Sequence, residues 1–181
     1  MKFIAETLIQ DLINSCHLHI KRVDLLSELS SEQLNYKFNA EKWSILECIE
    51  HLNLYSAYYL PALKHSITNS THTAVTEFKS GLIGNYFAKS MAPKAKLNKM
   101  KSPADKIPNS SELNATVLTT FITQQKELID LLEAAKRVNL TKTKTPISIS
   151  TILKLRLGDT FRFVSAHNDR HILQAENVLK D

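Results

Sequence analysis

Hydrophobic residues recur at intervals of three and four positions over most of the chain, and this spacing predicts amphipathic α-helices. The first such stretch runs from about Phe3 to Leu29. It carries two adjacent apolar stripes, formed by Leu8, Leu12, Leu26 and Leu29 and by Ile9, Ile13, Cys16, Ile20 and Val23. We expect a wide core-facing surface on this helix, which ends at Ser30-Ser31. A short polar connection then leads to Trp43.

A second helix is expected to begin at Ser44. Ser44 and Glu47 have the spacing of a capping box, in which the hydroxyl accepts from the Glu47 backbone N–H and the carboxylate accepts from the Ser44 N–H. The expected inward face consists of Cys48, His51, Leu52, Tyr55, Tyr58 and Tyr59. Pro61 predicts a kink or break further along, because proline cannot donate the intrahelical hydrogen bond.

Residues from about 69 to 109 are punctuated by helix-breaking positions, namely Gly81, Gly84, Pro93, Pro103 and Pro108. This pattern predicts a long crossover with one short helix, around Leu82 to Met91. So long a connection is unusual in a compact domain, and we expect it to form a functional lid or a groove wall.

Two further helices complete the pattern. The third is predicted from Ser111 to about Arg137, with its apolar positions at Leu113, Val117, Phe121, Leu128, Leu131 and Leu132. A break over 139–149, where threonine and lysine alternate before Pro146, precedes the fourth helix. That helix is predicted from near Leu157 or Asp159 to Lys180, with Gly158 as a weak point at its start.

The inward stripe of the fourth helix reads Thr160, Phe163 or Val164, His167, His171, Gln174 and Val178. With four long helical segments and no strand-like alternation, the sequence predicts an all-α fold, a four-helix bundle with a long crossover between helices two and three. The content of three glycines and five prolines favours the same fold class.

Size and composition predict one domain over residues 1–181, because a chain that is 43% hydrophobic can build a sizeable core at this length. Glu6 and Asp11 interrupt the N-terminal region before a signal peptide could form, and no later segment reaches membrane-spanning length. Two cysteines are too few for a disulfide framework and are typical of a reducing compartment. We therefore expect a cytoplasmic protein with no membrane partner.

The net charge of +5 is concentrated in one stretch, in which Asp105 is the sole acid among Lys89, Lys94, Lys96, Lys99, Lys101 and Lys106. Such a stretch could attract an anionic substrate or a nucleic acid. No aromatic stacking pattern or nucleic-acid-binding motif accompanies the lysines, which favours a solvated loop. No nucleic-acid partner is expected.

Three histidines are candidate metal ligands. His167 and His171 are four residues apart and share one helix face, so both can point at one ion. His51 lies on the inward face of the second helix and is the best third ligand. Three imidazoles leave a coordination position for water or substrate, as in catalytic metal sites. The alternative from spacing alone is that neighbouring polar groups satisfy these histidines.

For the other candidate residues, a structural role is an alternative to a role in catalysis or metal binding. Glu47 could act as a general base or hold an imidazole tautomer, but its capping role already explains it. Tyr55 could reach a bound substrate with its hydroxyl, or line the core. Cys48 is expected to be a buried thiol. His17 and His19 face differently, so at most one of them could join a site, and His65 and His72 are expected at the surface.

Two segments, 43–52 with its Trp-Ser-Ile-Leu-Glu start and 157–174 with His167 and His171, resemble the DinB-like superfamily, the DinB- and YfiT-like metalloenzymes. Met100 to Pro103 and the Pro146 break also match, and the similarity spans nearly the whole chain. The resemblance implies a four-helix bundle and a divalent metal (nickel, zinc, manganese or iron) held by His51, His167 and His171. Arg170 and Gln174 match positions beside the family's metal site.

The relatives include transferases that use bacillithiol and an isomerase that uses mycothiol, so the resemblance implies a low-molecular-weight thiol as a cosubstrate. Homodimers are also common among them. Our leading hypothesis is a divalent-metal-dependent thiol transferase or hydrolase acting on a small, anionic substrate. The alternatives are a noncatalytic metal-binding module related to stress, a DNA-binding protein, and a purely structural bundle.

Overall fold

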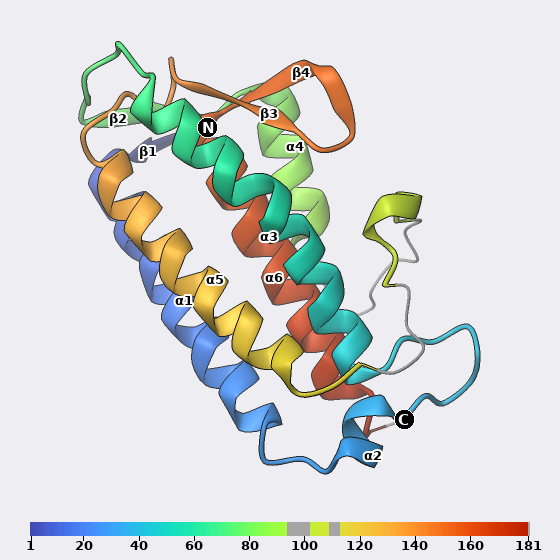
Figure 1. Cartoon of the computed structure of the whole chain (residues 1–181). Helices are drawn as coiled ribbons and strands as arrows, with labels where there is room; N and C mark the ends of the chain where they lie inside the picture. The colour runs from blue at the N-terminus through green and yellow to red at the C-terminus, as the bar shows by residue number, and fades with distance from the viewer. Residues whose placement is uncertain (94–101, 109–112, 181) are drawn as a thin grey trace.

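The computed structural model describes residues 1–93, 102–108 and 113–180. Its framework is formed by four long helices, α1 (Ala5–Leu26), α3 (Ile45–Thr68), α5 (Thr116–Ala135) and α6 (Leu157–Asn177). Both α1 and α3 pack against α5 and against α6, so the four helices enclose a common core (Figure 1). The all-α fold class predicted from the sequence is confirmed.

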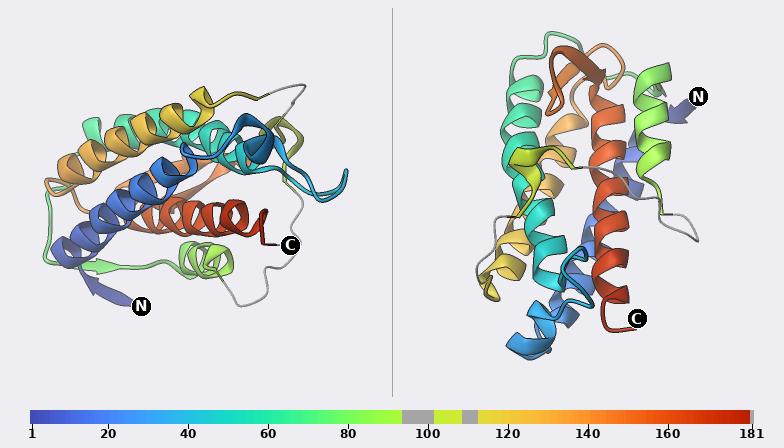
Figure 2. Two further views of the ribbon diagram at one scale, coloured as in Figure 1. Left: turned by 90° about the horizontal axis from the view of Figure 1, so that it is seen from below. Right: turned by 90° about the vertical axis from the view of Figure 1, so that its right-hand side faces the viewer.

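Shorter elements lie around this framework, some at its ends and some along its sides. They are β1 (Lys2–Ile4), α2 (Ser31–Asn35), β2 (Glu77–Lys79), α4 (Leu82–Met91), the 3₁₀ helix η1 (Ala104–Lys106), β3 (Lys144–Ile147) and β4 (Ser150–Arg156). Strand β1 pairs antiparallel with β2, and β3 with β4. Helix α4 of the crossover, whose bounds agree with the prediction, packs beside α6 (Figure 2).

The β3–β4 hairpin corrects the expectation that the chain contains no strands. Thr145 and Ile147 are buried, whereas Lys144 is exposed, so the short threonine and lysine alternation does place alternate side chains on opposite faces. Pairing of Thr145 with Leu155 extends the hairpin to the start of α6. The pattern was too short and too polar to be distinguished from a loop.

Two predicted helix ends also need correction. Ser30 does not simply end the first helix: it is the N-cap of α2, with a capping box completed by Gln33. Helix α5 begins at Thr116, after Leu113, and the predicted start at Ser111 lies outside the described residues. The first and fourth helices each end three residues before the predicted Leu29 and Lys180.

Helix α3 continues through Pro61 to Thr68, so the predicted break is wrong. The N–H that proline lacks would have bonded the carbonyl of Ala57, one turn earlier. Both residues are solvent-exposed, and water can satisfy that carbonyl. The capping box at the start of α3 is present as predicted, with Ser44 accepting from Glu47 N at 3.2 Å and Glu47 accepting from Ser44 N at 2.8 Å.

The buried hydrophobic residues form two clusters. One extends along α6 as far as Val164, and the other begins on that helix at Ile172. His167 and His171 occupy the interval between them, so a polar layer interrupts the apolar core at this level. In the part of the chain that the structure describes, no helix is long and apolar enough to cross a membrane.

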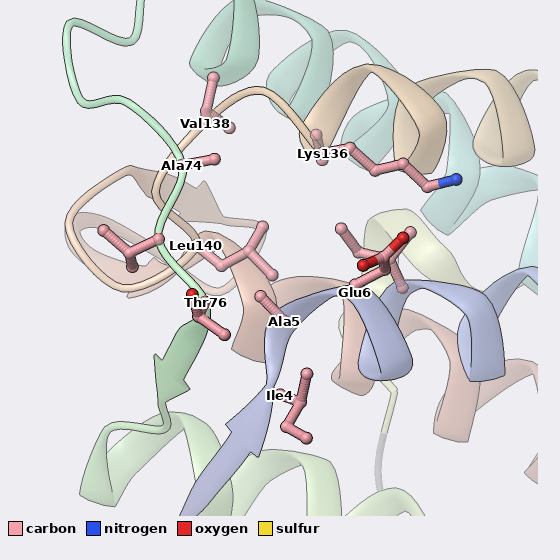
Figure 3. Close-up of a pocket in the computed structure, with 11 residues that line it drawn as sticks. Ile4, Ala5, Glu6, Ala74, Thr76, Lys136, Val138 and Leu140 are labelled. Carbon is pink, nitrogen blue, oxygen red and sulfur yellow. The ribbon is translucent and has the colours of Figure 1, made fainter.

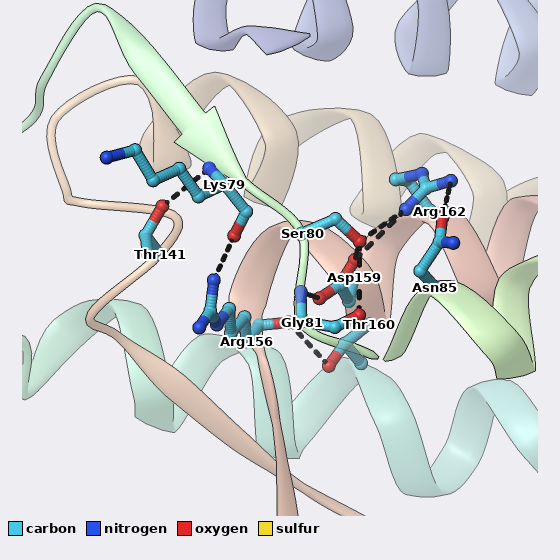
Figure 4. A network of polar contacts seen from close by, with 9 residues as sticks. All are labelled: Lys79, Ser80, Gly81, Asn85, Thr141, Arg156, Asp159, Thr160 and Arg162. Carbon is cyan, nitrogen blue, oxygen red and sulfur yellow. Dashed lines mark hydrogen bonds and ion pairs between the residues drawn. The ribbon is translucent and has the colours of Figure 1, made fainter. Parts of the chain in front are cut away.

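A buried carboxylate fastens α4 to α6. Asp159 accepts hydrogen bonds from the Ser80 hydroxyl, from Gly81 N at 2.8 Å and from Arg162 at 3.0 Å (Figure 4). Gly84 allows the close approach, since a Cβ there would lie 2.5 Å from the Asp159 Cβ. The clamp fixes the crossover helix beside the first half of α6.

Candidate metal centre

Three histidine side chains converge between α3 and α6. His51 comes from the second turn of α3, and His167 and His171 come from successive turns of α6. Their candidate ligand atoms all lie within 4.8 Å of one another, and the residues are only 1%, 5% and 9% exposed. The sequence analysis selected these three histidines, and the fold brings them together.

The crossover orients His51. Its Nδ1–H donates to the backbone carbonyl of Lys106 at 2.6 Å. A carbonyl can only accept, so this bond places the ring proton on Nδ1 and leaves the Nε2 lone pair directed at the other histidines. Residue 106 belongs to η1, which therefore forms part of the wall of the site.

Gln174 orients His171 in the same manner. The Nδ1–H of His171 donates to Gln174 Oε1 at 3.0 Å, from a position one turn further along α6. The His171 Nε2 is then the nitrogen available to a ligand. Gln174 is thus a positioning residue, which gives a physical role to a position that the sequence resemblance only marked as lying beside the site.

All three rings are neutral near pH 7. The pKa of His51 is lowered to about 4, chiefly by burial and also by the charge of Lys106, against the opposing effect of the hydrogen bond to the Lys106 carbonyl. Burial, with His51 and Arg170 nearby, lowers the pKa of His171 to about 3. Burial also lowers the pKa of His167 well below its ordinary value. Neutral imidazole is the form that binds metals.

The spacing of the nitrogens suits a single ion. His51 Nε2 and His167 Nε2 are 3.3 Å apart. Two nitrogens bound at about 2.1 Å to one tetrahedral ion would lie about 3.4 Å apart. Since the Lys106 carbonyl holds the His51 proton on Nδ1, only a proton on His167 or a cation can occupy the space between the two nitrogens. The residues present therefore fit a divalent metal.

Aromatic rings surround the cluster. Trp43 packs on His51 with ring centroids 4.8 Å apart, Tyr55 packs on His167 at 4.4 Å, and Phe163 stacks on His167 at 5.7 Å and 8°. These contacts restrict rotation of the imidazoles and limit the access of bulk water, which strengthens electrostatic interactions inside the site.

Two cationic residues border the histidines. Arg170 is buried, and its charge lowers the pKa values of both His167 and His171. The Lys106 ammonium lies 6.0 Å from the centroid of Tyr55 and only 12% of its side chain is exposed. The Lys106 ammonium also forms an ion pair with Asp105 at 3.3 Å, and Asp105 is itself largely exposed. The two cations beside a neutral cluster favour an anionic ligand.

The other candidate groups are placed as follows. Burial raises the pKa of Tyr55 to about 12, so its hydroxyl remains a hydrogen-bond donor at neutral pH. The two carboxylate oxygens of Glu47 bond Ser44 N and Lys37 Nζ, which assigns Glu47 a capping role. Cys48 is fully buried, and burial raises the pKa of its thiol.

The remaining histidines lie outside the cluster. His19 is buried against Asp169 on the opposite face of α6, at 2.9 Å, and His65 and His72 are exposed as expected. Of the lysine-rich stretch, Lys89 and Lys106 are described. The other four lysines, Lys94, Lys96, Lys99 and Lys101, lie outside the described residues.

Sequence reasoning missed three contributors to the site: the Lys106 carbonyl, the Trp43 wall and the Phe163 stack. A backbone carbonyl 55 residues away from its partner leaves no trace in the sequence. Trp43 immediately precedes the capping box, and Phe163 lies four residues before His167, so both could have been placed by helical spacing.

Comparison with known protein families identifies a match that covers the site. The family model of the DinB superfamily matches residues 22–175, which include α3, all but the last two residues of α6, and all three histidines of the cluster. No curated protein and no solved structure matches the chain. The matched region covers well over half of the sequence and contains the elements that build the site. The chain belongs to the DinB superfamily.

Proposed function

We propose that this protein is a divalent-metal-dependent enzyme in which His51, His167 and His171 hold the metal. The observation that carries the proposal is the convergence of three buried, neutral imidazoles, two of which have their Nδ1 protons tied to the Lys106 carbonyl and to Gln174. Such tethering is what metal-ligating histidines generally show. Nickel, zinc and iron suit an imidazole donor set, whereas manganese prefers oxygen ligands and is retained as a candidate from the family resemblance.

A divalent cation bound by three histidines would lower the pKa of a water or thiol in the remaining coordination position, so that a nucleophile is available near neutral pH. The protein would hold the three imidazoles in fixed orientations and shield them from bulk water. Trp43, Tyr55 and Phe163 restrict the rings, as their contacts with the imidazoles show.

The substrate that we propose is small and anionic. Arg170 and Lys106 border the cluster with positive charge, which would attract a carboxylate or a phosphate attached to the reacting group. The Tyr55 hydroxyl stays protonated because of its raised pKa, so it can donate a hydrogen bond to an oxyanion that develops during the reaction.

Two reaction classes fit this equipment. In thiol transfer, the sulfur of a low-molecular-weight thiol forms a bond to carbon of an electrophile, the leaving group departs with its electron pair, and the thiol proton passes to solvent. In hydrolysis, water takes the place of the thiol. We place thiol transfer first, because the relatives that the sequence resembles include transferases that use bacillithiol.

A noncatalytic metal-binding module is the second candidate. Its support is that Glu47, an acid one turn before His51 on the same helix, is engaged by Ser44 and Lys37. Under this alternative the protein would bind metal and accelerate neither reaction.

The test uses protein reconstituted with each of the four metals and the metal-free protein. Conjugation of a small thiol to a chromogenic electrophile and hydrolysis of an activated ester are measured side by side. The proposal expects acceleration by the metal-loaded wild type that His167→Ala abolishes and His65→Ala retains. Metal uptake without acceleration of either reaction would favour the noncatalytic module.

A further inference from the structure

A second feature adjoins the histidine cluster: an apolar pocket of about 180 Å³. Helix α4, the β3–β4 hairpin and the helices α3 and α6 all contribute to it. Its main lining residues are Tyr55, Phe87, Met91, Ile147, Leu155 and Phe163. Two of the elements that supply these side chains are themselves fixed in place, α4 by the clamp on Asp159 and the hairpin by its strand pairing.

The pocket shares two walls with the candidate metal centre. Tyr55 and Phe163 line it, and the same two rings contact His167, with centroid distances of 4.4 Å and 5.7 Å. A group in the pocket would therefore be separated from the histidines by the thickness of a single side chain. Pro103 adds a wall from the crossover, three residues before the Lys106 carbonyl that orients His51.

A larger cavity of about 310 Å³ lies elsewhere, where α1 begins and α5 ends (Figure 3). Its lining includes Glu6 and Lys136 and none of the three histidines. It is therefore not placed to receive a substrate of the metal centre.

The volume and lining of the smaller pocket select its ligand. An apolar cavity of about 150 Å³ takes up benzene in a well-studied case, so 180 Å³ suits one aromatic ring or a short branched alkyl group. The polar edge is small: the Tyr59 hydroxyl lies 3.4 Å from both the Ser148 hydroxyl and the Ser148 N–H. These groups form hydrogen bonds with one another, so an apolar ligand would leave no buried donor without a partner.

We propose that this pocket binds the apolar portion of the substrate, an aromatic ring or branched alkyl group of about benzene size, and thereby places the attached electrophilic atom beside the histidines. The proposal rests on the proposed metal-dependent function and narrows its substrate class. The substrate would combine an anionic end, held near Arg170 and Lys106, with an apolar end held between α4 and the hairpin.

The test uses fluorobenzene as the probe and follows its ¹⁹F NMR signal in titrations of the metal-free protein, so no activity is required. Ile149→Trp and Met91→Trp fill the pocket from the hairpin and from α4. Ile152→Trp is the matched control, because Ile152 lies on the same hairpin, is 90% exposed and does not line the pocket. Circular dichroism verifies that each variant is folded.

We expect saturable binding by the wild type and by Ile152→Trp, and at least a fivefold loss of affinity in both pocket-filling variants. Absence of saturable binding, or binding that neither filling variant weakens, would overturn the proposal. A second titration with protein loaded with paramagnetic Mn²⁺, compared with Zn²⁺, tests proximity. The bound ¹⁹F signal should broaden only with manganese.

Different results would refute the metal-dependent function and the assignment of the pocket to its substrate. If elemental analysis shows that none of nickel, zinc, manganese and iron loads, the metal-dependent function is wrong, and the pocket is judged by the metal-free titration alone. If manganese loads and the bound probe is not broadened, the metal centre stands and the assignment of the pocket to its substrate is wrong.

Discussion

Replacing Gln174 by leucine should weaken metal binding without unfolding the protein. Gln174 accepts the Nδ1–H of His171 at 3.0 Å, and it is the partner that keeps the His171 proton off Nε2. In the metal-free Gln174→Leu variant, which lacks this acceptor, the His171 proton can move to either ring nitrogen. A bound ion requires the Nε2 lone pair and therefore forces the proton onto Nδ1, where the variant offers no acceptor. The missing hydrogen bond therefore destabilises the metal-bound state.

The size of the effect follows from the burial of the ring. His171 is 9% exposed, and leaving its N–H without a partner costs about 1–3 kcal/mol. Since about 1.4 kcal/mol corresponds to a factor of ten, the dissociation constant should rise by roughly 5- to 150-fold. Measured losses for partners of metal-ligating histidines lie in the same range, about 10- to 100-fold.

The assay is competition for Zn²⁺ against a chromophoric chelator of known affinity. Gln10→Leu makes the same chemical change on the exposed face of α1 and should bind as the wild type does. Gln174→Glu keeps an acceptor and should retain affinity. If Gln174→Leu binds zinc as tightly as the wild type, the argument that this hydrogen bond orients a ligand is refuted.

Three further predictions concern stability and reactivity. Gly84→Ala places a Cβ 2.5 Å from the Asp159 Cβ. It should lower the free energy of unfolding, measured in urea, by about 1–2 kcal/mol. Gly81→Ala is the control and should be close to neutral, because its Cβ would meet its nearest atom at 3.4 Å. The metal-free protein should lose stability as the pH falls from about 6.5 to 4. Burial lowers the pKa to about 4 for His51 and about 3 for His171 in the folded protein. Over this pH range the unfolded chain therefore binds more protons than the folded protein does. The slope should reach about 1.4 kcal/mol per pH unit for each buried histidine, and a flat unfolding profile over that range would contradict this. Burial raises the pKa of both cysteine thiols, so a thiol reagent at pH 8 should label neither in the native protein and both in guanidinium; rapid native labelling would show that the core is open.

The sequence predicted the elements that have strong local signals. The capping box at Ser44 and Glu47 located the start of α3, and the glycine and proline pattern located α4 within the crossover. The spacing of His167 and His171 placed both on one face of α6, because helical geometry alone determines that relation. These features depend on residues close together in the chain.

The parts that were missed depend on contacts between distant segments. The carbonyl of residue 106 reaches His51 only because the crossover folds back over α3. The hairpin was missed because the burial of Thr145 and Ile147 is decided by packing against the bundle, which a four-residue alternation does not reveal. Ser30 and Gln33 did carry a capping-box signal, and the short helix α2 could have been predicted from it.

The central claim is that three histidines form one metal site, and metal content per protomer tests it most directly. Wild-type protein, His51→Ala, His167→Ala, His171→Ala and the exposed control His65→Ala would each be equilibrated with nickel, zinc, manganese or ferrous iron, dialysed and analysed for bound metal. We predict about one divalent ion in the wild type and in the control, and its loss in each cluster variant. A wild type that retains none of the four metals, or a His51→Ala variant that retains its metal, would contradict the claim.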